Sequence, residues 1–364
     1  MAESTTRISS EIDFNRDGKQ VGFLRLPHSV HRSAYGWIPI PVACIRNGDG
    51  PRVLLMAGNH GDEYEGQIAL AALLRALDAK DVRGRLIFLT SANFPAAMAG
   101  TRTSPIDAGN LNRSFPGDTD GGITAQIAWY IEHVLLPQCD YVFDLHSGGS
   151  SLMYLPSGLS RRHADATRMA RSLELLQAFG APVSYVTDAP QGEDRTLTAA
   201  AARQGVMHLG TELGGGGTLS IAALRAAEEG VRRALKLVGA LAESVAVTPA
   251  PATRLLQVRG SDYFVYAPDA GLFEPLVELG DEVSAGQKAG LIHFHDTPWR
   301  EPGVAIFQRA GTVLCKRMPC RTERGDCLFH LGTEYTETAP EAPSAPSHRA
   351  EADGVWQARS VRGD

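Results

Sequence analysis

The chain of 364 residues has no long apolar segment. Its first twenty residues are polar, and no apolar stretch of the kind found in signal peptides follows them, so we expect no secretory signal. No apolar run approaches the roughly 20 residues that a membrane-spanning helix requires. These absences predict a cytoplasmic protein that has no membrane partner.

Cysteine is scarce and positive charge is in deficit. Five cysteines without a signal peptide fit a reducing compartment better than a disulfide framework. The 35 lysines and arginines stand against 41 aspartates and glutamates, which gives a net charge of −6 with histidine neutral. Because binding of a phosphate backbone needs a basic face, this balance argues against a nucleic acid partner. It is compatible with a small anionic ligand, which a few local arginines can bind.

Short apolar runs alternate with helical periodicity through most of the chain, after a β-rich entry over residues 1–45. The predicted strands are 52–58, 85–91, 140–146, 181–188 and 206–213, and the predicted helices are 62–79, 123–137, 160–178 and 219–245. Strands that alternate with helices predict an α/β fold. We expect a mostly parallel mixed sheet with helices on both faces.

A Pro/Ala-rich stretch, AVTPAPAT (246–253), separates this pattern from one of short strands and glycine turns. The sequence LFEPLVELGDEVSAGQKAGLIHF resembles lipoyl-like β domains but has no lysine in the usual hairpin setting, so no attached cofactor is expected. The end of the chain is polar and rich in Ala, Pro and Glu. We therefore predict a catalytic α/β domain over 1–250, a small all-β domain over 251–335 and a disordered tail over 336–364.

Three short motifs follow predicted strands. They are GNHGDE (58–63), DLHSGG (144–149) and TELGGGG (211–217). In open α/β sheets, ligands bind outside the carboxyl ends of the strands. All three motifs are therefore expected to face one crevice.

The residue types in these motifs suit a catalytic zinc site. A catalytic zinc commonly takes three protein ligands of the His/His/Glu kind and keeps one position for water, and His60, Glu63 and His146 supply that set. Zinc lowers the pKa of bound water to about 7, and a separate carboxylate must then move the proton. Glu212 is the candidate for that role. The ligand set alone leaves other divalent ions open.

The loop AGTRTSPIDAGNLNRSFPG (99–117) contributes polar groups to the predicted crevice. Arg102 can stabilise negative charge that develops on a carbonyl oxygen. Asn112 and Arg113 can bind a substrate carboxylate, arginine through its bidentate fork. The loop therefore offers the two kinds of group that hydrolysis of an amide needs besides the metal, one for the oxyanion and one to anchor the substrate.

Together GNHGDEYEG, NLNRSFPG and DLHSGG resemble the succinylglutamate desuccinylase/aspartoacylase family, which is similar to the zinc carboxypeptidases. The resemblance covers roughly residues 40–335. It implies a zinc carboxypeptidase-like fold, one Zn²⁺ per chain, and a zinc amidohydrolase that acts on a small N-acyl amino acid. By this resemblance His60, Glu63 and His146 are the metal ligands and Glu212 the general base. Arg102 polarises the scissile carbonyl, and Asn112 with Arg113 binds the carboxylate.

Within that family, TRTSPIDAGNLNRSFPG, DLHSGG and TELGGGGT are most similar to the deacetylases of ectoine degradation. The expected reaction is hydrolysis of N-alpha-acetyl-L-2,4-diaminobutyrate to acetate and L-2,4-diaminobutyrate. Three alternatives stay open: a succinylglutamate desuccinylase or aspartoacylase-type deacylase, a carboxypeptidase-like peptidase, and a non-catalytic binding module. The α versus γ preference for the acetyl group and the oligomeric state are also open, and a homodimer is compatible.

Neighbouring polar residues have simpler interpretations. Asp144 either orients a ligand histidine or caps a turn. Asp62 supports the first turn of the following helix, and Glu65 is a solvated or first-turn acid. His208 stands among apolar neighbours and is expected to be a core histidine, and 161–163 is expected to be a solvated helix start.

Overall fold

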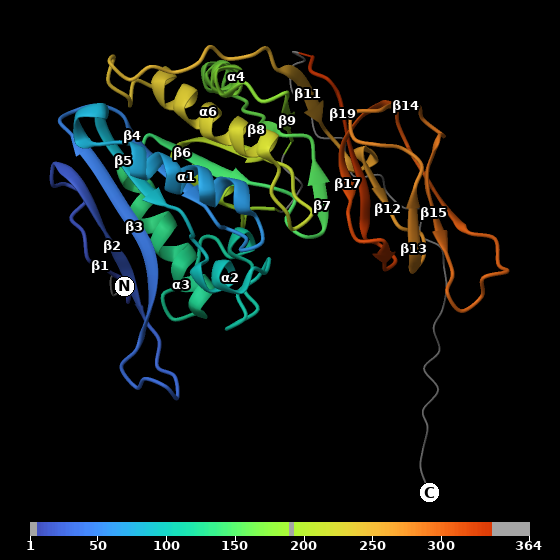
Figure 1. Ribbon diagram of the computed structural model, residues 1–364, viewed down its shortest axis with the longest axis horizontal. Coiled ribbons are helices and arrows are strands. Elements are labelled where there is room, and N and C mark those ends of the chain that lie inside the picture. Colours follow the sequence, from blue (N-terminus) through green and yellow to red (C-terminus); the bar gives the residue numbers. More distant parts are fainter. Residues whose placement is uncertain (1–5, 189–192, 337–364) are drawn as a thin grey trace, which may run out of the picture.

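The computed structural model describes residues 6–188 and 193–336 (Figure 1). The tail predicted over 336–364 lies outside the described residues, apart from Thr336. The strands of one large mixed sheet are β1 (Ser9–Ser10), β2 (Gly18–Pro27), β3 (Trp37–Asn47), β4 (Arg52–Ala57), β5 (Gly84–Leu89), β6 (Tyr141–His146), β7 (Leu152–Tyr154), β8 (Ser157–Arg161), β9 (Val183–Thr187), β10 (Met207–Glu212), β11 (Arg254–Val258), β12 (Phe264–Tyr266), β14 (Glu282–Val283), β17 (Gly311–Arg317) and β19 (Cys327–Glu334). A second sheet contains β13 (Gly271–Pro275), β15 (Lys288–His293), β16 (Gly303–Ile306) and β18 (Arg321–Thr322).

Helices connect the central strands. They are α1 (Tyr64–Ala76), α2 (Phe94–Ala99), α3 (Ile123–Tyr130), α4 (Ala166–Phe179), α5 (Leu197–Arg203) and α6 (Ile221–Leu237). Shorter helical turns are η1 (Ala79–Asp81), η2 (Leu111–Arg113), η3 (Ile131–Leu135), η4 (Leu136–Gln138) and η5 (Ser261–Tyr263). Strands β5, β4, β6 and β10 are neighbours and run parallel, whereas β8 pairs antiparallel with β10. The carboxyl ends of β4, β6 and β10 therefore meet at one edge.

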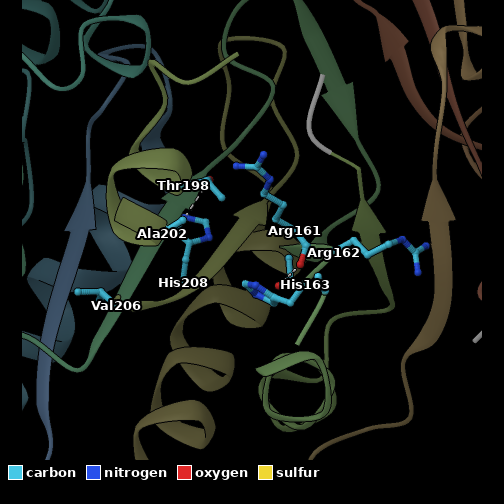
Figure 2. Close-up of a pocket in the computed structure, with 9 residues that line it drawn as sticks. Arg161, Arg162, His163, Thr198, Ala202, Val206 and His208 are labelled. Atoms are coloured by element: carbon cyan, nitrogen blue, oxygen red, sulfur yellow. Dashed lines mark hydrogen bonds between the residues drawn. The ribbon is translucent and has the colours of Figure 1, made fainter. Parts of the chain in front are cut away.

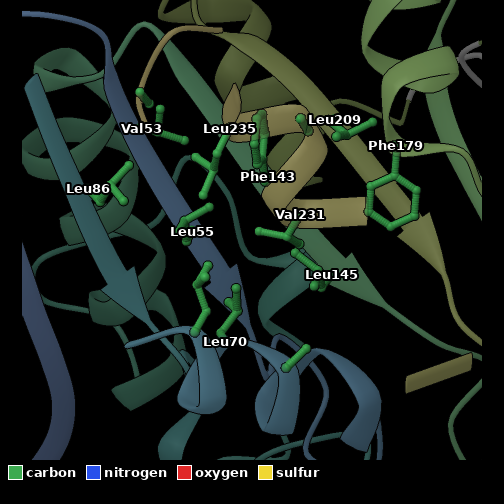
Figure 3. Packing of buried hydrophobic residues seen from close by; sticks show 14 of the residues in the cluster. Val53, Leu55, Leu70, Leu86, Phe143, Leu145, Phe179, Leu209, Val231 and Leu235 are labelled. Atoms are coloured by element: carbon green, nitrogen blue, oxygen red, sulfur yellow. The ribbon is translucent and has the colours of Figure 1, made fainter. Parts of the chain in front are cut away.

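Helices pack on both faces of the sheet, as the apolar runs predict. Along β4, Val53 and Leu55 face one apolar core while Leu54 and Met56 face another, because successive side chains of a strand point to opposite faces. The first core packs against α1, α4 and α6, which lie together on one side in Figure 1. Figure 3 shows the strand residues of this core against Val231 of α6. The second core packs against α3 and α5.

The strands that follow residue 254 have a third apolar core of their own, which also takes in Tyr185 of β9. The second sheet supports an all-β region at this end of the molecule (Figure 1). This region is joined to the large sheet, because β11 pairs with β9 and β17 pairs with β7. The pairing of Cys315 with Tyr154 brings β17 beside the segment that follows His146. The division of the chain at residue 250 stays a prediction.

The helix predicted over 160–178 is wrong in its first part. Residues Ser157–Arg161 form β8, and α4 begins only after Asp165, whose side chain accepts a hydrogen bond from the Arg168 backbone N–H at 2.7 Å. This N-cap satisfies a backbone donor that the first turn of a helix leaves free.

The expected solvated helix start over 161–163 is also wrong. Arg161 ends a strand, and Arg162 is partly buried with its Nε 2.8 Å from Asp188 Oδ1. The helix predicted over 219–245 ends at Leu237. Among the described residues, no helix has the length and apolar character needed to cross a membrane.

Close packing between α6 and α4 gives the first prediction. A Cβ added to Gly230 would lie 2.6 Å from Cε2 of Phe179, which is fully buried. Alanine has a helix propensity better than glycine by about 1 kcal/mol, but overpacking costs about 1–3 kcal/mol. We expect Gly230→Ala to lower the free energy of unfolding by about 1 kcal/mol in urea denaturation.

The double variant Gly230→Ala/Phe179→Leu serves as the control, because leucine makes room for the added methyl group. Its loss of stability should be smaller than the sum of the two single losses. A Gly230→Ala chain more stable than the parent would contradict the packing argument.

Candidate active site

Three predicted metal ligands meet at the carboxyl edge of the sheet. His60 and Glu63 stand in the turn between β4 and α1, and His146 ends the neighbouring parallel strand β6. His60 Nδ1 lies 2.7 Å from Glu63 Oε1, and His146 Nδ1 lies 2.8 Å from Glu63 Oε2. One ligand atom from each residue lies within 4.8 Å of the others. This group can hold a metal ion.

The outer nitrogens of both histidines have partners of their own. His60 Nε2 lies 3.1 Å from Asn110 Oδ1, and His146 Nε2 lies 2.9 Å from Asp144 Oδ2. An oxygen that accepts the Nε2 proton leaves Nδ1 free to bind a metal and fixes the ring. Of the two roles considered for Asp144, the structure thus favours the orientation of a ligand histidine.

Burial and charge act in opposite directions within this cluster. Burial alone would raise the pKa of Glu63, but His146 and His60 hold that pKa well below its usual range. Burial alone would lower the pKa of His146, but Asp144 and Glu63 raise it well above its usual value. The lowered pKa of Glu63 means that this carboxylate is ionised at neutral pH, and the raised pKa of His146 reflects an environment that favours a positive charge, which suits a cation.

Glycines allow the motif segments to approach one another. A Cβ added to Gly61 would lie 2.0 Å from the Ala96 carbonyl oxygen, so that only glycine fits there. Gly149 has a φ of +56°, and a Cβ there would lie 2.8 Å from Asp62 Oδ2. The same oxygen accepts hydrogen bonds of 2.7 Å from the backbone N–H and the hydroxyl of Ser150. Asp62 thus anchors the segment after His146, where the sequence suggested only support of a helix turn.

The loop between α2 and α3 brings its predicted residues to the same place. Arg102 Nη1 lies 3.4 Å from His60 Nδ1 and 3.6 Å from Glu63 Oε1. Asn112 Nδ2 lies 3.4 Å from His146 Nε2, and Asn112 Oδ1 accepts a hydrogen bond from the Leu197 backbone N–H at 2.9 Å.

Arg113 is adjacent to these groups. Its Nη1 donates to the Asn112 carbonyl oxygen at 2.7 Å, and its Nε lies 3.2 Å from Glu193 Oε2. Side chains of Arg102 and Arg113 are both close to half exposed. Their guanidinium groups are therefore accessible to a ligand that enters from solvent.

Glu212 ends β10 directly beside His146 in the parallel register. Its Oε2 is buried and has no hydrogen-bond partner among the described residues. Burial raises the pKa of Glu212 well above its usual range, and Glu63 adds to the rise. One cavity of about 320 Å³ brings together all the predicted site residues, which are His60, Glu63, Arg102, Asn112, Arg113, His146 and Glu212.

Some site residues escaped the sequence reasoning. Asn110 supports His60, although its place two residues before Asn112 in NLNR offered a signal. Asn59 is fully buried, and its Nδ2 lies 3.4 Å from Asp144 Oδ2. Glu65 lies in the first turn of α1, which is one of the two places expected for it, but it is 1 % exposed rather than solvated, and burial raises its pKa.

Known proteins are similar to this chain in sequence. Residues 49–238 match the profile of the succinylglutamate desuccinylase/aspartoacylase catalytic domain. The chain is 41% identical over 321 residues to an N-alpha-acetyl-L-2,4-diaminobutyric acid deacetylase from Halomonas elongata, a match that covers 88% of this chain and 93% of the relative.

Solved structures agree with the sequence match. A succinylglutamate desuccinylase/aspartoacylase from Rhodobacter sphaeroides is 39% identical with a TM-score of 0.86, covering 91% of this chain and 100% of that one. The product-bound ectoine utilization protein EutE (DoeB) from Ruegeria pomeroyi is 38% identical with a TM-score of 0.85 and the same coverage. This chain therefore belongs to the succinylglutamate desuccinylase/aspartoacylase family.

Proposed function

We propose that this chain is a zinc-dependent deacylase that hydrolyses N-alpha-acetyl-L-2,4-diaminobutyrate to acetate and L-2,4-diaminobutyrate. The observation that carries the proposal is the convergence of two histidines, two glutamates, two arginines and an asparagine in one cavity. The name of the Halomonas elongata relative, at 41% identity over most of both chains, supports the choice of substrate.

His60, Glu63 and His146 would hold the zinc ion. Their donor set is the His/His/Glu kind that catalytic zinc prefers, and both Nδ1 atoms face the same carboxylate. When bound, zinc lowers the pKa of water to about 7 and polarises a carbonyl group. The ring-fixing contacts of Asn110 and Asp144 favour a metal over a simple ion pair, because they leave each Nδ1 free as a ligand.

Glu212 would move the proton. Hydrolysis forms a bond from water oxygen to the acetyl carbon and breaks the bond from that carbon to the α-nitrogen. A carboxylate beside His146 can accept the proton of the attacking water and deliver it to the leaving nitrogen. The unpaired Oε2 of Glu212 is an acceptor for that proton. The raised pKa of Glu212 favours retention of the proton between the two transfers.

Arg102 and the Asn112–Arg113 pair would bind the negative charges of the substrate. Arg102 approaches the ligand cluster, where its guanidinium can stabilise the oxyanion that forms on the acetyl carbonyl. Asn112 and Arg113 can bind the α-carboxylate, arginine by two parallel N–H donors. These roles use both arginines that line the cavity.

The balance of charge in the cavity favours diaminobutyrate over an acidic amino acid. Aspartate and glutamate carry a second carboxylate, which needs a further cation. Among the described residues that line the catalytic cavity, Arg102 and Arg113 supply the lysine or arginine groups, whereas Glu63, Asp144 and Glu212 are acidic. An ammonium side chain therefore matches the remaining wall better than a carboxylate does.

The position of β7 argues against a peptidase with an open cleft. Leu152 and Tyr154 line the cavity, and β17 of the C-terminal β region pairs with their strand. Strand β17 thus stands beside the cavity and restricts the room for a long peptide. A small acylated amino acid fits this enclosure better.

The metal proposal predicts the effect of a change at Asp144. Asp144→Asn removes the charge that supports His146, and loss of such a partner commonly lowers metal affinity about 10–100-fold. Competition with a chromogenic zinc chelator measures the affinity. The control is Asp140→Asn, which makes the same change just before the other end of β6, where the side chain pairs with Arg52. Equal zinc affinity in the two variants would contradict the role of Asp144.

The proton-transfer role predicts that Glu212→Gln retains zinc and loses turnover. Glutamine has a similar shape but cannot accept the proton, and general acid–base catalysis contributes about 10²–10⁴-fold. Zinc content by elemental analysis and kcat by acetate release test this pair of outcomes. Glu174→Gln, at an exposed position of α4, should leave both unchanged. A Glu212→Gln enzyme that stays fast would show that another group moves the proton.

The substrate proposal predicts the ranking of a panel. Zinc-loaded protein is offered N-alpha-acetyl-L-2,4-diaminobutyrate, N-acetylaspartate, succinylglutamate and an unmodified dipeptide, and release of the free amine is measured. We expect kcat/KM for the diaminobutyrate compound to exceed that for the other compounds by about tenfold or more. Its side-chain ammonium can pair with the acidic groups of the cavity, whereas a side-chain carboxylate would be buried there without a cation. Preference for an acidic compound would support the deacylase chemistry but would show that the substrate is an acidic N-acyl amino acid.

A further inference from the structure

A side pocket of about 310 Å³ adjoins the catalytic cavity. His208 and Thr198 line both of them, so that these two side chains form a shared wall. Figure 2 shows His208 and Thr198 on one side of the side pocket, with Arg161 and His163 across from them. None of these residues has a part in the chemistry proposed above.

The strands beneath the cavity explain why His208 reaches it. His208, Gly210 and Glu212 alternate along β10 and therefore point to the same face. In the parallel register Gly210 pairs with Asp144 of β6, two residues before the pair formed by Glu212 and His146. A Cβ at residue 210 would lie 2.9 Å from His208 Cε1. The absence of a Cβ at Gly210 thus makes room for the His208 ring, with Leu159 beside it, and lets the ring reach the floor of the cavity.

Unpaired polar atoms surround this floor. Within the described part of the chain, Asp144 Oδ1 and His208 Nδ1 are buried and have no hydrogen-bond partner, while His208 Nε2 lies 3.4 Å from Thr198 Oγ1. Buried polar atoms normally have partners, because an unpaired one costs free energy. A ligand with several N–H donors and no acceptor would satisfy them, and a primary ammonium is such a group.

The protonation of His208 is compatible with that ligand. Burial lowers the pKa of His208 to about 4, and Asp144 opposes this only in part. The ring is therefore neutral at pH 7, so that with its proton on Nε2 it offers Nδ1 as an acceptor. Asp144 uses Oδ2 for His146, which leaves Oδ1 to provide the negative charge.

We propose that the ammonium-bearing side chain of the substrate extends from Glu212 toward His208 along the floor of the cavity and is bound by Asp144 Oδ1 and His208 Nδ1. This inference rests on the proposed function, since it places the α-nitrogen beside Glu212. Same-face positions of a strand are about 6.6 Å apart, which is the scale of a short aminoalkyl chain. His208 is then a specificity-determining residue, and Asp144 has a second task besides orienting His146.

Arg161 limits the length of the substrate side chain that this subsite can bind. Leu159 of β8 pairs with Gly210, and Arg161 lies two residues further along the same face, across the side pocket from His208. An ammonium on a longer side chain would move away from Asp144 and toward the Arg161 guanidinium, which repels it. The subsite should therefore prefer the two-carbon side chain of diaminobutyrate over longer diamino acids.

The test separates recognition of the ammonium from general damage. The parent, His208→Leu and His163→Leu are compared on N-alpha-acetyl-L-2,4-diaminobutyrate and on N-acetylnorvaline, in which a methyl group replaces the ammonium. A hydrogen bond to a charged group contributes about 1.5–3 kcal/mol, so kcat/KM of His208→Leu for the ammonium compound should fall about 10–100-fold. Its kcat/KM for N-acetylnorvaline should stay within about threefold, and His163→Leu should match the parent on both compounds.

Two further measurements guard against a variant that is merely misfolded. His208→Gln, which retains an acceptor, should recover part of the preference for the ammonium compound. Calorimetric binding of the product L-2,4-diaminobutyrate should weaken in His208→Leu by a similar factor, whereas binding of L-norvaline should not. Thermal unfolding of each variant shows that it is folded.

Each contrary outcome has a distinct meaning. If His208→Leu loses both substrates equally, or retains its preference for the ammonium, the subsite is wrong while the proposed function stands. If the parent prefers an acyl amino acid with a side-chain carboxylate, Arg161 is the recognising group and both the subsite and the proposed substrate are wrong. Better turnover of N-acetylornithine than of the diaminobutyrate compound would overturn the limit set by Arg161.

Discussion

The site depends on one buried carboxylate. Glu63 is 3 % exposed, and its two oxygens contact two histidines that come from different strands. The Ser147 backbone N–H donates to Oε2 of the same carboxylate at 3.1 Å. A buried anion is costly unless it is paired, so the neighbouring segments must supply its partners. The turn after β4 and the segment after β6 are thereby held at a fixed separation.

Strands β6 and β10 organise the rest of the cavity by their register. His146 pairs with Glu212 at the carboxyl ends of the two strands, and Asp144 pairs with Gly210 two residues earlier along each strand. The first pair contains a proposed metal ligand and the proposed proton carrier, and the second contains the carboxylate of the proposed subsite and the glycine that makes room for the His208 ring. A one-residue slip would turn every one of these side chains to the opposite face. The residues of the proposed chemistry and of the proposed subsite are thus placed by the same ladder of hydrogen bonds.

Long apolar runs were the reliable part of the prediction. The strands around 52–58, 140–146 and 206–213 and the helix after Glu63 lie where expected, because continuous apolar runs and helical periodicity are strong signals. Residues 160–161 were mistaken for the start of a helix, since the strand that they end is held by pairing with β9 and β10 rather than by its own composition. Glu65 lies in the first turn of a helix, as one of its two interpretations had it, but its burial could not be predicted because nothing in the sequence shows that neighbouring segments cover this position.

The sequence by itself determined the donor set. The motifs GNHGDE and DLHSGG contain the predicted metal ligands, NLNR contains the predicted carboxylate-binding pair, and TEL contains the predicted proton carrier. Their places at strand ends imply one edge of the sheet, because parallel strands end together. Only the tertiary structure decided which atoms face one another. It showed that Asp144 and Asn110 fix the histidine rings, that Asp62 anchors the segment at Ser150, and that His208 reaches the cavity over Gly210. Such contacts join residues far apart in the chain, and their geometry follows from strand register and packing, which no local pattern encodes.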